Sequence, residues 1–586
     1  MRKVFLIIFF FSFFVSFGQT SQTINSAALN NFNLLRENIF IHTDRDFYFA
    51  GDVLWFKVYV INHESHKLQS LSKTAFVEVV NKDNSPVLQA KILVDSGIGN
   101  GSFKINSSVE SGRYTLRAYT NWMKNDTTSV FEKSLVILNT EKPLDTTVFK
   151  VNEEISSPQE TRPLNVTRQG LSVTADKTNY RPRDLVRLGL NLERDSLANL
   201  SVSVYRLNEI TRAFNSPDIL DYVHNLRSQK PFETPLTYLP ELNGMLVTAE
   251  VRKDVSGNGA AGTPVYLSAL GKVTDVQAGF TDKEGKVNFV LTKEYGRGQI
   301  LLKTDSVYQD GISFSVEKPF LSVYSNVSDK PVVFTKSEIN DLEDMQSHRI
   351  VNRNFIPSYL DESVEATDST PFYGKPYRTY FLDNYTRFTT MEEVLREYVQ
   401  EVNVRIRERN YSLQVFNRQY FDIGKFMTLS NMMTDGNPLV LLDGVPVFNM
   451  NKIIAYDPLK VKKLDIVAGR YHIGPKSWNG LLSFSTYKGN FEGFQLNPHD
   501  MVVDFQGWQP KTEFHYPDYA DVSLKNSRIP DFRELLYWNG NVTLHHYQGN
   551  LSFYTDDLAG KFIVVVQGIT QSGVPVFGTT VFEVTR

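Results

Sequence analysis

Residues 41–57 read IHTDRDFYFAGDVLWFK and contain the pattern that decides the fold. An Asp, a Tyr and an Asp at four-residue intervals precede an alternating apolar stretch, and this arrangement occurs twice: Asp44, Tyr48 and Asp52, then Asp176, Tyr180 and Asp184. Alternation of apolar and polar residues is typical of a half-buried strand. We interpret the aspartates as tying down a turn, with the tyrosine ring covering the edge of a core. A binding site is the alternative interpretation.

A second repeat involves a glycine that opens a strand in which every other residue is apolar. It follows a phenylalanine by a short loop at three places: Phe103 with Gly112, Phe289 with Gly298, and Phe553 with Gly560. This pattern predicts a recurring hairpin of a β-sandwich with one face buried. The 41 Phe and 28 Tyr residues suit such pleated surfaces.

The fold class that these repeats predict is mainly β, with tandem immunoglobulin-like sandwiches. We place the sandwiches at 36–141, 168–238, 240–325 and 492–586. Residues 142–167, rich in Pro, Thr and Glu and without periodicity, are expected to be a linker. A second linker, 328–371, is expected to contain a helix, and 208–228 to be partly helical.

Residues 372–490 have a different pattern and predict a small α+β domain. Thr390 lies three residues before Glu393, which is a capping-box arrangement, and the following residues give one apolar helix face. Three strands are expected, at 438–442, 461–467 and 481–486. Asp443-Gly444 predicts a tight turn after the first of them.

Length and composition exclude several classes of protein. At 586 residues the chain should form about four domains. It has no cysteine, so disulfides, thiolate metal sites and an internal thioester are impossible. The net charge of −3 provides no field that would recruit nucleic acid or an anionic membrane.

Residues 1–18 have the pattern of a cleaved secretory signal peptide. Arg2 and Lys3 precede the apolar run 4–17, and Ser16 and Gly18 place small residues before a cleavage point. The run is short for a membrane-spanning helix, and no later run is long enough. We therefore expect an exported protein without a transmembrane helix in its mature chain.

The sequence contains no recognisable catalytic motif. Residues 257–262 read GNGAAG, but a strand follows where a dinucleotide site would need a helix, so a loop is expected. His545 and His546 would point to opposite faces of a strand and could not readily share a metal. We expect no enzyme activity, no cofactor and no metal. Three tryptophans in turn-like contexts are candidate exposed aromatics for a sugar or a partner, but core packing is the favoured interpretation for each: Trp478, Trp508 and Trp538.

Two regions resemble known families. Residues 41–57, with the later strand 112–120, resemble the second macroglobulin (MG2) domain of the alpha-macroglobulin family, and 385–488 resembles the plug domain of TonB-dependent receptors. The plug-like motif residues are Asp443, Gly444, Val445, Pro446, Gly469 and Gly480. The combination is similar to exported proteins common in Bacteroidota, whose pattern also includes Asp531-Phe532-Arg533.

These resemblances imply a non-enzymatic binding or scaffold protein of the periplasm or outer membrane. The plug-like domain would engage an outer-membrane or envelope protein. The chain after Lys488 is too short for a 22-stranded barrel at about 10 residues per strand, so this is no transporter by itself. A macroglobulin-like protease inhibitor without a thioester and a glycan-binding surface protein are the alternatives.

Overall fold

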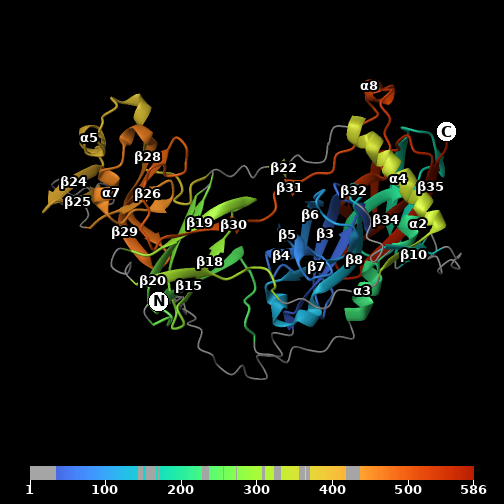
Figure 1. The fold of residues 1–586 in the computed structure, drawn as a ribbon, viewed down its shortest axis with the longest axis horizontal. Coiled ribbons are helices and arrows are strands. Elements are labelled where there is room, and N and C mark those ends of the chain that lie inside the picture. The colour runs from blue at the N-terminus through green and yellow to red at the C-terminus, as the bar shows by residue number, and fades with distance from the viewer. Residues whose placement is uncertain are drawn as a thin grey trace, which may run out of the picture.

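The computed structural model (Figure 1) describes thirteen stretches of the chain. They are residues 34–142, 149–152, 166–168, 170–214, 216–226, 236–254, 256–271, 274–305, 311–322, 331–355, 363–364, 370–416 and 436–586. The proposed signal peptide, 1–18, lies outside them. Strands dominate, as the sequence predicts, and they form nine sheets among the described residues.

The first sandwich occupies 37–138 and matches the predicted range. Its three-stranded sheet has the order β1 (Glu37–Thr43), β3 (Val53–Asn62), β6 (Ile98–Lys104). Its five-stranded sheet has the order β2 (Phe47–Phe49), β8 (Phe131–Leu138), β7 (Gly112–Thr120), β4 (Thr74–Val80), β5 (Pro86–Leu93). Two short 3-10 helices, η1 (Trp122–Asn125) and η2 (Thr127–Ser129), precede β8. Alternate apolar residues of both sheets, such as Leu54 and Leu116, form one buried core.

The predicted sandwiches at 168–238 and 492–586 are one domain, which corrects the sequence-based division. A single nine-stranded sheet joins them in the order β10 (Val166–Arg168), β35 (Pro575–Val584), β34 (Gly560–Thr570), β14 (Leu197–Arg206), β32 (Leu535–His545), β33 (Gln548–Tyr554), β13 (Leu185–Leu192), β11 (Leu171–Ala175), with β12 (Asn179–Tyr180) beside β35. β14 pairs with β32 on one side and with β34 on the other. The alternating pattern of a strand indicates a buried face, but it does not identify the neighbouring strands.

The third sandwich also takes a strand from beyond residue 492. Its sheets have the orders β18 (Lys286–Leu291), β15 (Met245–Lys253), β20 (Ile312–Val316) and β17 (Asp275–Phe280), β16 (Pro264–Leu270), β19 (Arg297–Lys303), β30 (Met501–Gln506). β30 pairs with β19, and Trp508 lies in the same core. The predicted range 240–325 is therefore completed by residues 501–508.

The predicted hairpins of the glycine repeat are arches between non-adjacent strands. β6 and β7 lie in different sheets of the first sandwich, and β18 and β19 lie in different sheets of the third. β33 and β34 share a sheet without pairing. The apolar alternation is the same in both arrangements, because consecutive strands of an arch also place one face each against the shared core.

The α+β domain follows its prediction closely. Its sheet has the order β23 (Arg378–Phe381), β28 (Val461–Ile473), β29 (Lys476–Thr486), β26 (Leu439–Leu442), β27 (Val445–Pro446), beside the hairpin of β24 (Val402–Arg407) and β25 (Asn410–Val415). Helix α5 (Met391–Glu397) begins at Thr390, whose hydroxyl accepts from the Glu393 N–H. α7 (Met450–Ile454), η3 (Leu382–Asn384) and η5 (Pro458–Lys460) complete the domain.

The remaining elements connect the domains. α2 (Glu209–Ala213), α3 (Ile219–Leu226) and α4 (Lys336–Phe355) confirm the predicted helical regions, and α8 (Val522–Lys525) is a single turn. The predicted linker 142–167 contains a strand, β9 (Phe149–Asn152), parallel to β21 (Val332–Thr335). β22 (Ser363–Val364) pairs with β31 (Lys511–Thr512), so the segment that leads into the α+β domain lies beside a segment that follows it. The first and second sandwiches lie together, and the third sandwich and the α+β domain form the other end (Figure 1).

Candidate functional site

The first Asp-Tyr-Asp turn forms one wall of the candidate site. Asp44 Oδ1 accepts hydrogen bonds from the Tyr48 hydroxyl and from the Trp55 N–H, both at 2.8 Å. Asp52 Oδ2 accepts from the Phe49 N–H at 3.0 Å. Asp44 is buried, which raises the pKa of its carboxyl to about 6 although Arg45 lies beside it.

The second copy makes the same bonds. Asp176 Oδ1 accepts from the Tyr180 hydroxyl at 2.6 Å and from the Arg187 N–H at 2.9 Å. Asp184 Oδ2 accepts from the Arg181 N–H at 3.1 Å. The interpretation of this motif as a turn-fastening device is confirmed in both copies.

The two copies differ in exposure, and this predicts different effects on stability. The Asp44 side chain is 0% exposed and that of Asp176 is 29% exposed. Asp44→Ala should lower the free energy of unfolding by about 3 kcal/mol, because it leaves the buried Trp55 N–H without its acceptor and removes the nearer of the two carboxylates beside Arg45, whereas Asp176→Ala should cost about 1 kcal/mol. Urea titration of both variants measures this difference. Equal losses would contradict the burial argument.

A cleft of about 830 Å³ lies between this turn, α4 and residues 514–535. The first sandwich contributes Phe49, Asp52, Trp55, Lys104 and Ser107. Helix α4 contributes Met345, Arg349, Asn352 and Arg353. The C-terminal segment contributes Phe514, His515, Phe532, Arg533 and Glu534. Three parts of the chain that are far apart in sequence therefore form one concave surface.

Arg349 fastens α4 to the first turn. Its Nε lies 3.4 Å from Asp52 Oδ1, its Nη2 donates to the Ala50 carbonyl, and its guanidinium lies over the Phe49 ring. Gly51, at φ +97°, leaves room for it, because a Cβ there would lie 2.6 Å from Nη2. A glycine is thus needed at residue 51 both for its backbone conformation and for the approach of this arginine.

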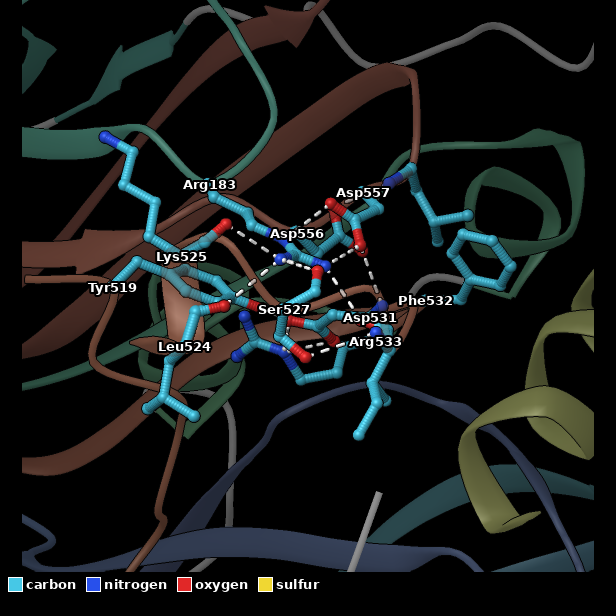
Figure 2. Close-up of polar contacts among 12 residues, drawn as sticks. Arg183, Tyr519, Leu524, Lys525, Ser527, Asp531, Phe532, Arg533, Asp556 and Asp557 are labelled. Carbon is cyan, nitrogen blue, oxygen red and sulfur yellow. Dashed lines mark hydrogen bonds and ion pairs between the residues drawn. The ribbon is translucent and has the colours of Figure 1, made fainter. Parts of the chain in front are cut away.

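Residues 531–534 form the opposite wall. The Asn352 side chain pairs with the backbone of Phe532, donating to its carbonyl at 2.6 Å and accepting from its N–H at 2.9 Å. Arg533 Nε lies 2.9 Å from both carboxylate oxygens of Asp531 (Figure 2). Glu534 Oε1 is hydrogen-bonded to His348 Nδ1 at 2.9 Å.

Two polar atoms on this wall have no partner. Arg533 Nη2 and Glu534 Oε2 are buried and make no hydrogen bond within the part of the chain that the structure describes. Basic residues outnumber acidic ones along the cleft, and the half-buried rings of Phe514 and Phe532 supply apolar contact. Such a surface can bind a ligand that offers both apolar and hydrogen-bonding groups. Over the described ranges, no group of His, Asp and Glu could hold a metal ion.

Comparison with known proteins identifies the first sandwich. A family model described as the MG2 domain matches residues 38–134. Residues 38–134 are MG2-like. The resemblance predicted for 36–141 is confirmed, while that of 385–488 to a receptor plug and the likeness to Bacteroidota proteins stay predictions. A comparison with curated proteins found no match.

Solved structures with detectable similarity include alpha-2-macroglobulins from two bacteria. The trypsin-activated protein of Escherichia coli is 10% identical, with 94% of this chain and 41% of that chain covered and a TM-score of 0.23. A Salmonella alpha-2-macroglobulin is also 10% identical, with 94% of this chain and 39% of that chain covered and a TM-score of 0.23. The Escherichia coli adhesin FdeC is 9% identical, with 45% of this chain and 59% of that chain covered and a TM-score of 0.14. The chain spans about two fifths of the macroglobulin chains, and TM-scores this low carry no argument about its arrangement.

The predicted plug-motif residues lie away from the cleft. Asp443 and Gly444 form the β26–β27 turn with φ of 47° and 82°, and Val445 and Pro446 form β27. The Asp443 carboxylate accepts from the N–H and hydroxyl of Thr486 and from the Phe491 N–H, at 2.6 to 2.7 Å. The two glycines with φ near 100° occupy a β-bulge and a contact with Val415: Gly469 and Gly480. These contacts stabilise the α+β domain.

Two of the three candidate tryptophans are buried, in agreement with the favoured interpretation of core packing and against their candidacy as exposed aromatics. Trp508 is 3% exposed in the core of the third sandwich, and its indole N–H donates to Thr74 Oγ1 of the MG2-like sandwich. Trp538 is 6% exposed and packs against His42. Trp478 is half-buried beside Phe448. The turn-like sequence around them did not reveal that each joins two parts of the chain.

Most residues of the cleft have no distinguishing pattern in the sequence. Asp52 and the segment 531–533 stood out, but as a turn and as part of a family pattern. Arg349 and Asn352 lie on a helix whose sequence is polar, where a buried contact has no distinctive spacing. Trp55 belongs to the alternating apolar stretch before residue 57, and only the structure places it beside Phe514, with ring centroids 5.7 Å apart.

No described helix has the length and apolar character that crossing a membrane requires.

Proposed function

We propose that the protein is an exported, non-enzymatic binding protein of the cell envelope, and that its cleft binds an extended polypeptide segment. The observation that carries this proposal is the cleft itself, formed by the MG2-like sandwich, α4 and residues 514–535. The match to an MG2 domain and the signal-like residues 1–18 support a non-enzymatic exported protein.

The chemistry of the cleft suits a peptide. The rings of Phe514 and Phe532 are half-buried along the cleft and offer a surface for an apolar side chain. Lys104 and Arg353 are exposed along the cleft and can donate hydrogen bonds to the carbonyl groups of a peptide backbone. At the rim, Arg353 is 69% exposed and pairs with Glu141 at 2.6 Å.

The plug-like α+β domain provides a separate part of the proposal. It has its own core and lies at the opposite end of the molecule from the first and second sandwiches (Figure 1). Its engagement with an outer-membrane or envelope protein, in the periplasm or at the outer membrane, rests on the sequence resemblance of 385–488.

A displayed random-peptide library selected on the purified full chain tests the cleft. The best peptide is then titrated against the wild type, Ser107→Trp and Ser256→Trp. Ser107 is exposed on the cleft wall, so an indole there should fill the cleft and weaken binding at least tenfold, by about 1.4 kcal/mol or more. Ser256 is exposed on a loop of the third sandwich and is the matched control.

The outcomes separate clearly. Loss of binding in Ser107→Trp with an unchanged Ser256→Trp would support the proposal. A library that yields no binder, or binders that tolerate Ser107→Trp, would exclude the cleft as a peptide site.

A protease inhibitor is the second candidate, and the MG2 match is the observation that favours it. Without cysteine it would have to act non-covalently. Incubation with several proteases, followed by size-exclusion chromatography, tests this function. The absence of a stable complex would end it.

A further inference from the structure

Residues 520–529 form a loop that projects from the second sandwich and exposes aliphatic side chains. It contains the single turn α8, which protrudes at the top of the view in Figure 1. Val522 is 68% exposed, Leu524 38% and Ile529 50%. These three residues lie within one short stretch, whereas isolated exposed aliphatic residues are common and need no explanation.

One arginine holds this loop in place. Arg183 Nη1 donates to the carbonyls of Leu524, Lys525 and Ser527 at 3.1, 2.9 and 2.7 Å, and Nη2 donates to the carbonyl of Ile529 at 2.8 Å (Figure 2). Its Nε and Nη2 also bind both carboxylate oxygens of Asp557 at 2.8 and 2.6 Å. A single guanidinium therefore fixes the backbone of the loop at four points.

The backbone of Arg183 has a strained conformation. Its φ is +61°, in the left-handed region that favours glycine. The two Asp-Tyr-Asp turns align residue by residue, and Gly51 occupies the equivalent position in the first turn with φ +97°. Glycine would relieve the strain at residue 183 but would remove the guanidinium that holds the loop. Backbone strain of this kind is concentrated at functional sites.

The base of the loop is also fixed. The hydroxyl of Tyr519 donates to Asp531 at 2.8 Å, and the Asp531 N–H donates to Asp557 at 2.9 Å (Figure 2). The Arg183 guanidinium lies over the Tyr519 ring, 5.2 Å from its centroid. Both ends of the loop are thus attached to the same buried cluster, and its exposed tip is held in a defined conformation.

We propose that residues 520–529 are a preorganised docking loop that inserts Val522, Leu524 and Ile529 into an apolar pocket of another protein. Holding a loop in its bound conformation lowers the entropy lost on association, which benefits a shaped protein pocket. The loop and its flank carry charges of both signs that balance: Asp518, Asp521, Lys525 and Arg528. This balance matches a pocket with a mixed rim and gives no attraction to an anionic lipid surface.

The test places a photo-reactive benzoylphenylalanine at Asn526, an exposed position in the loop, in the full chain produced in cells of the source organism. Irradiation should give a discrete protein adduct, which mass spectrometry identifies. That protein is then purified and titrated against the wild type, Leu524→Asp, Arg183→Gly and Val574→Asp. Val574 is 44% exposed in another loop of the same sandwich and is the matched control.

We expect Leu524→Asp to weaken binding at least tenfold and Arg183→Gly to weaken it severalfold, with Val574→Asp unchanged. Hydrogen exchange provides a separate check, because Arg183→Gly should raise exchange in 520–529 while β13 and β14 stay protected. Adducts only with lipid or with a second copy of this chain, no adduct, or equal affinity for Leu524→Asp would overturn the proposal. Unchanged exchange in Arg183→Gly would overturn the role of the anchor.

Discussion

Lys57→Met is expected to raise the free energy of unfolding at pH 7 by several kcal/mol. Lys57 lies on β3 at the contact between the MG2-like sandwich and the second sandwich, and it is 0% exposed. Its Nζ donates to the Leu200 carbonyl at 3.0 Å and lies over the Tyr59 ring, but no carboxylate of the described chain forms an ion pair with it. A buried ammonium without a counter-charge is costly, and methionine fills a similar volume without a charge.

The pH dependence of this effect follows from the pKa of Lys57. Burial lowers that pKa from 10.5 to about 7. Between these values the unfolded chain binds the proton that the folded chain lacks, so stability should rise with pH across this window. The full penalty applies below pH 7 and is on the order of 3 to 5 kcal/mol. Nearby His42 has its pKa lowered below 6.5 by burial, so it stays neutral throughout the window.

Denaturant titrations of the wild type and Lys57→Met at several pH values between 7 and 10 measure this effect through tryptophan fluorescence. The wild type should gain stability over the range, and Lys57→Met should remove only the share of that slope that Lys57 contributes, because Lys91 and Lys124, whose pKa values burial also lowers to about 8, contribute in the same window. Lys82→Met, an exposed lysine in a turn of the same sandwich, is the control and should keep the wild-type slope. An identical slope in Lys57→Met would show that the lysine is solvated.

The features that the sequence predicts correctly depend on contacts between residues close in the chain. Asp44 binds the Tyr48 hydroxyl and the Trp55 N–H, both within eleven residues, so a repeated spacing is enough to identify the turn. The same holds for α5 and for the Asp443-Gly444 turn, whose positive φ values are the conformation that this dipeptide favours.

The features that it does not predict depend on contacts across long separations. Asn352 pairs with the backbone of Phe532, 180 residues later, and Trp508 donates to Thr74 across 434 residues. Trp508 lies in a turn-like sequence, but it is buried in the folded protein because a distant segment packs against it. The cleft is formed by such long-range contacts. The sequence therefore shows which residue types are present, but it does not predict that these residues lie together.

Deleting residues 492–586 is expected to unfold the second sandwich completely, although the sequence pattern suggests that 168–238 is a separate domain. The deletion removes both neighbours of β14, the partner β33 of β13, and the half of the core contributed by residues 536–584. It also removes β30 and Trp508 from the third sandwich. The strands β11, β13 and β14 alone have a single exposed apolar face and cannot form a stable domain.

The matched control removes a similar length from inside the chain. Replacing 373–490 with a flexible linker should leave the second sandwich folded, because the buried core of the α+β domain contains no residue of the second sandwich. The pairing of β22 with β31 holds the two ends of this insertion together. Hydrogen exchange followed by mass spectrometry measures protection in β13 and β14 of both variants. Protection retained after deletion of 492–586 would show that 168–238 folds alone. Protection retained only in the internal deletion would show that the second sandwich consists of two separate segments of the chain, with the third sandwich and the α+β domain inserted between them.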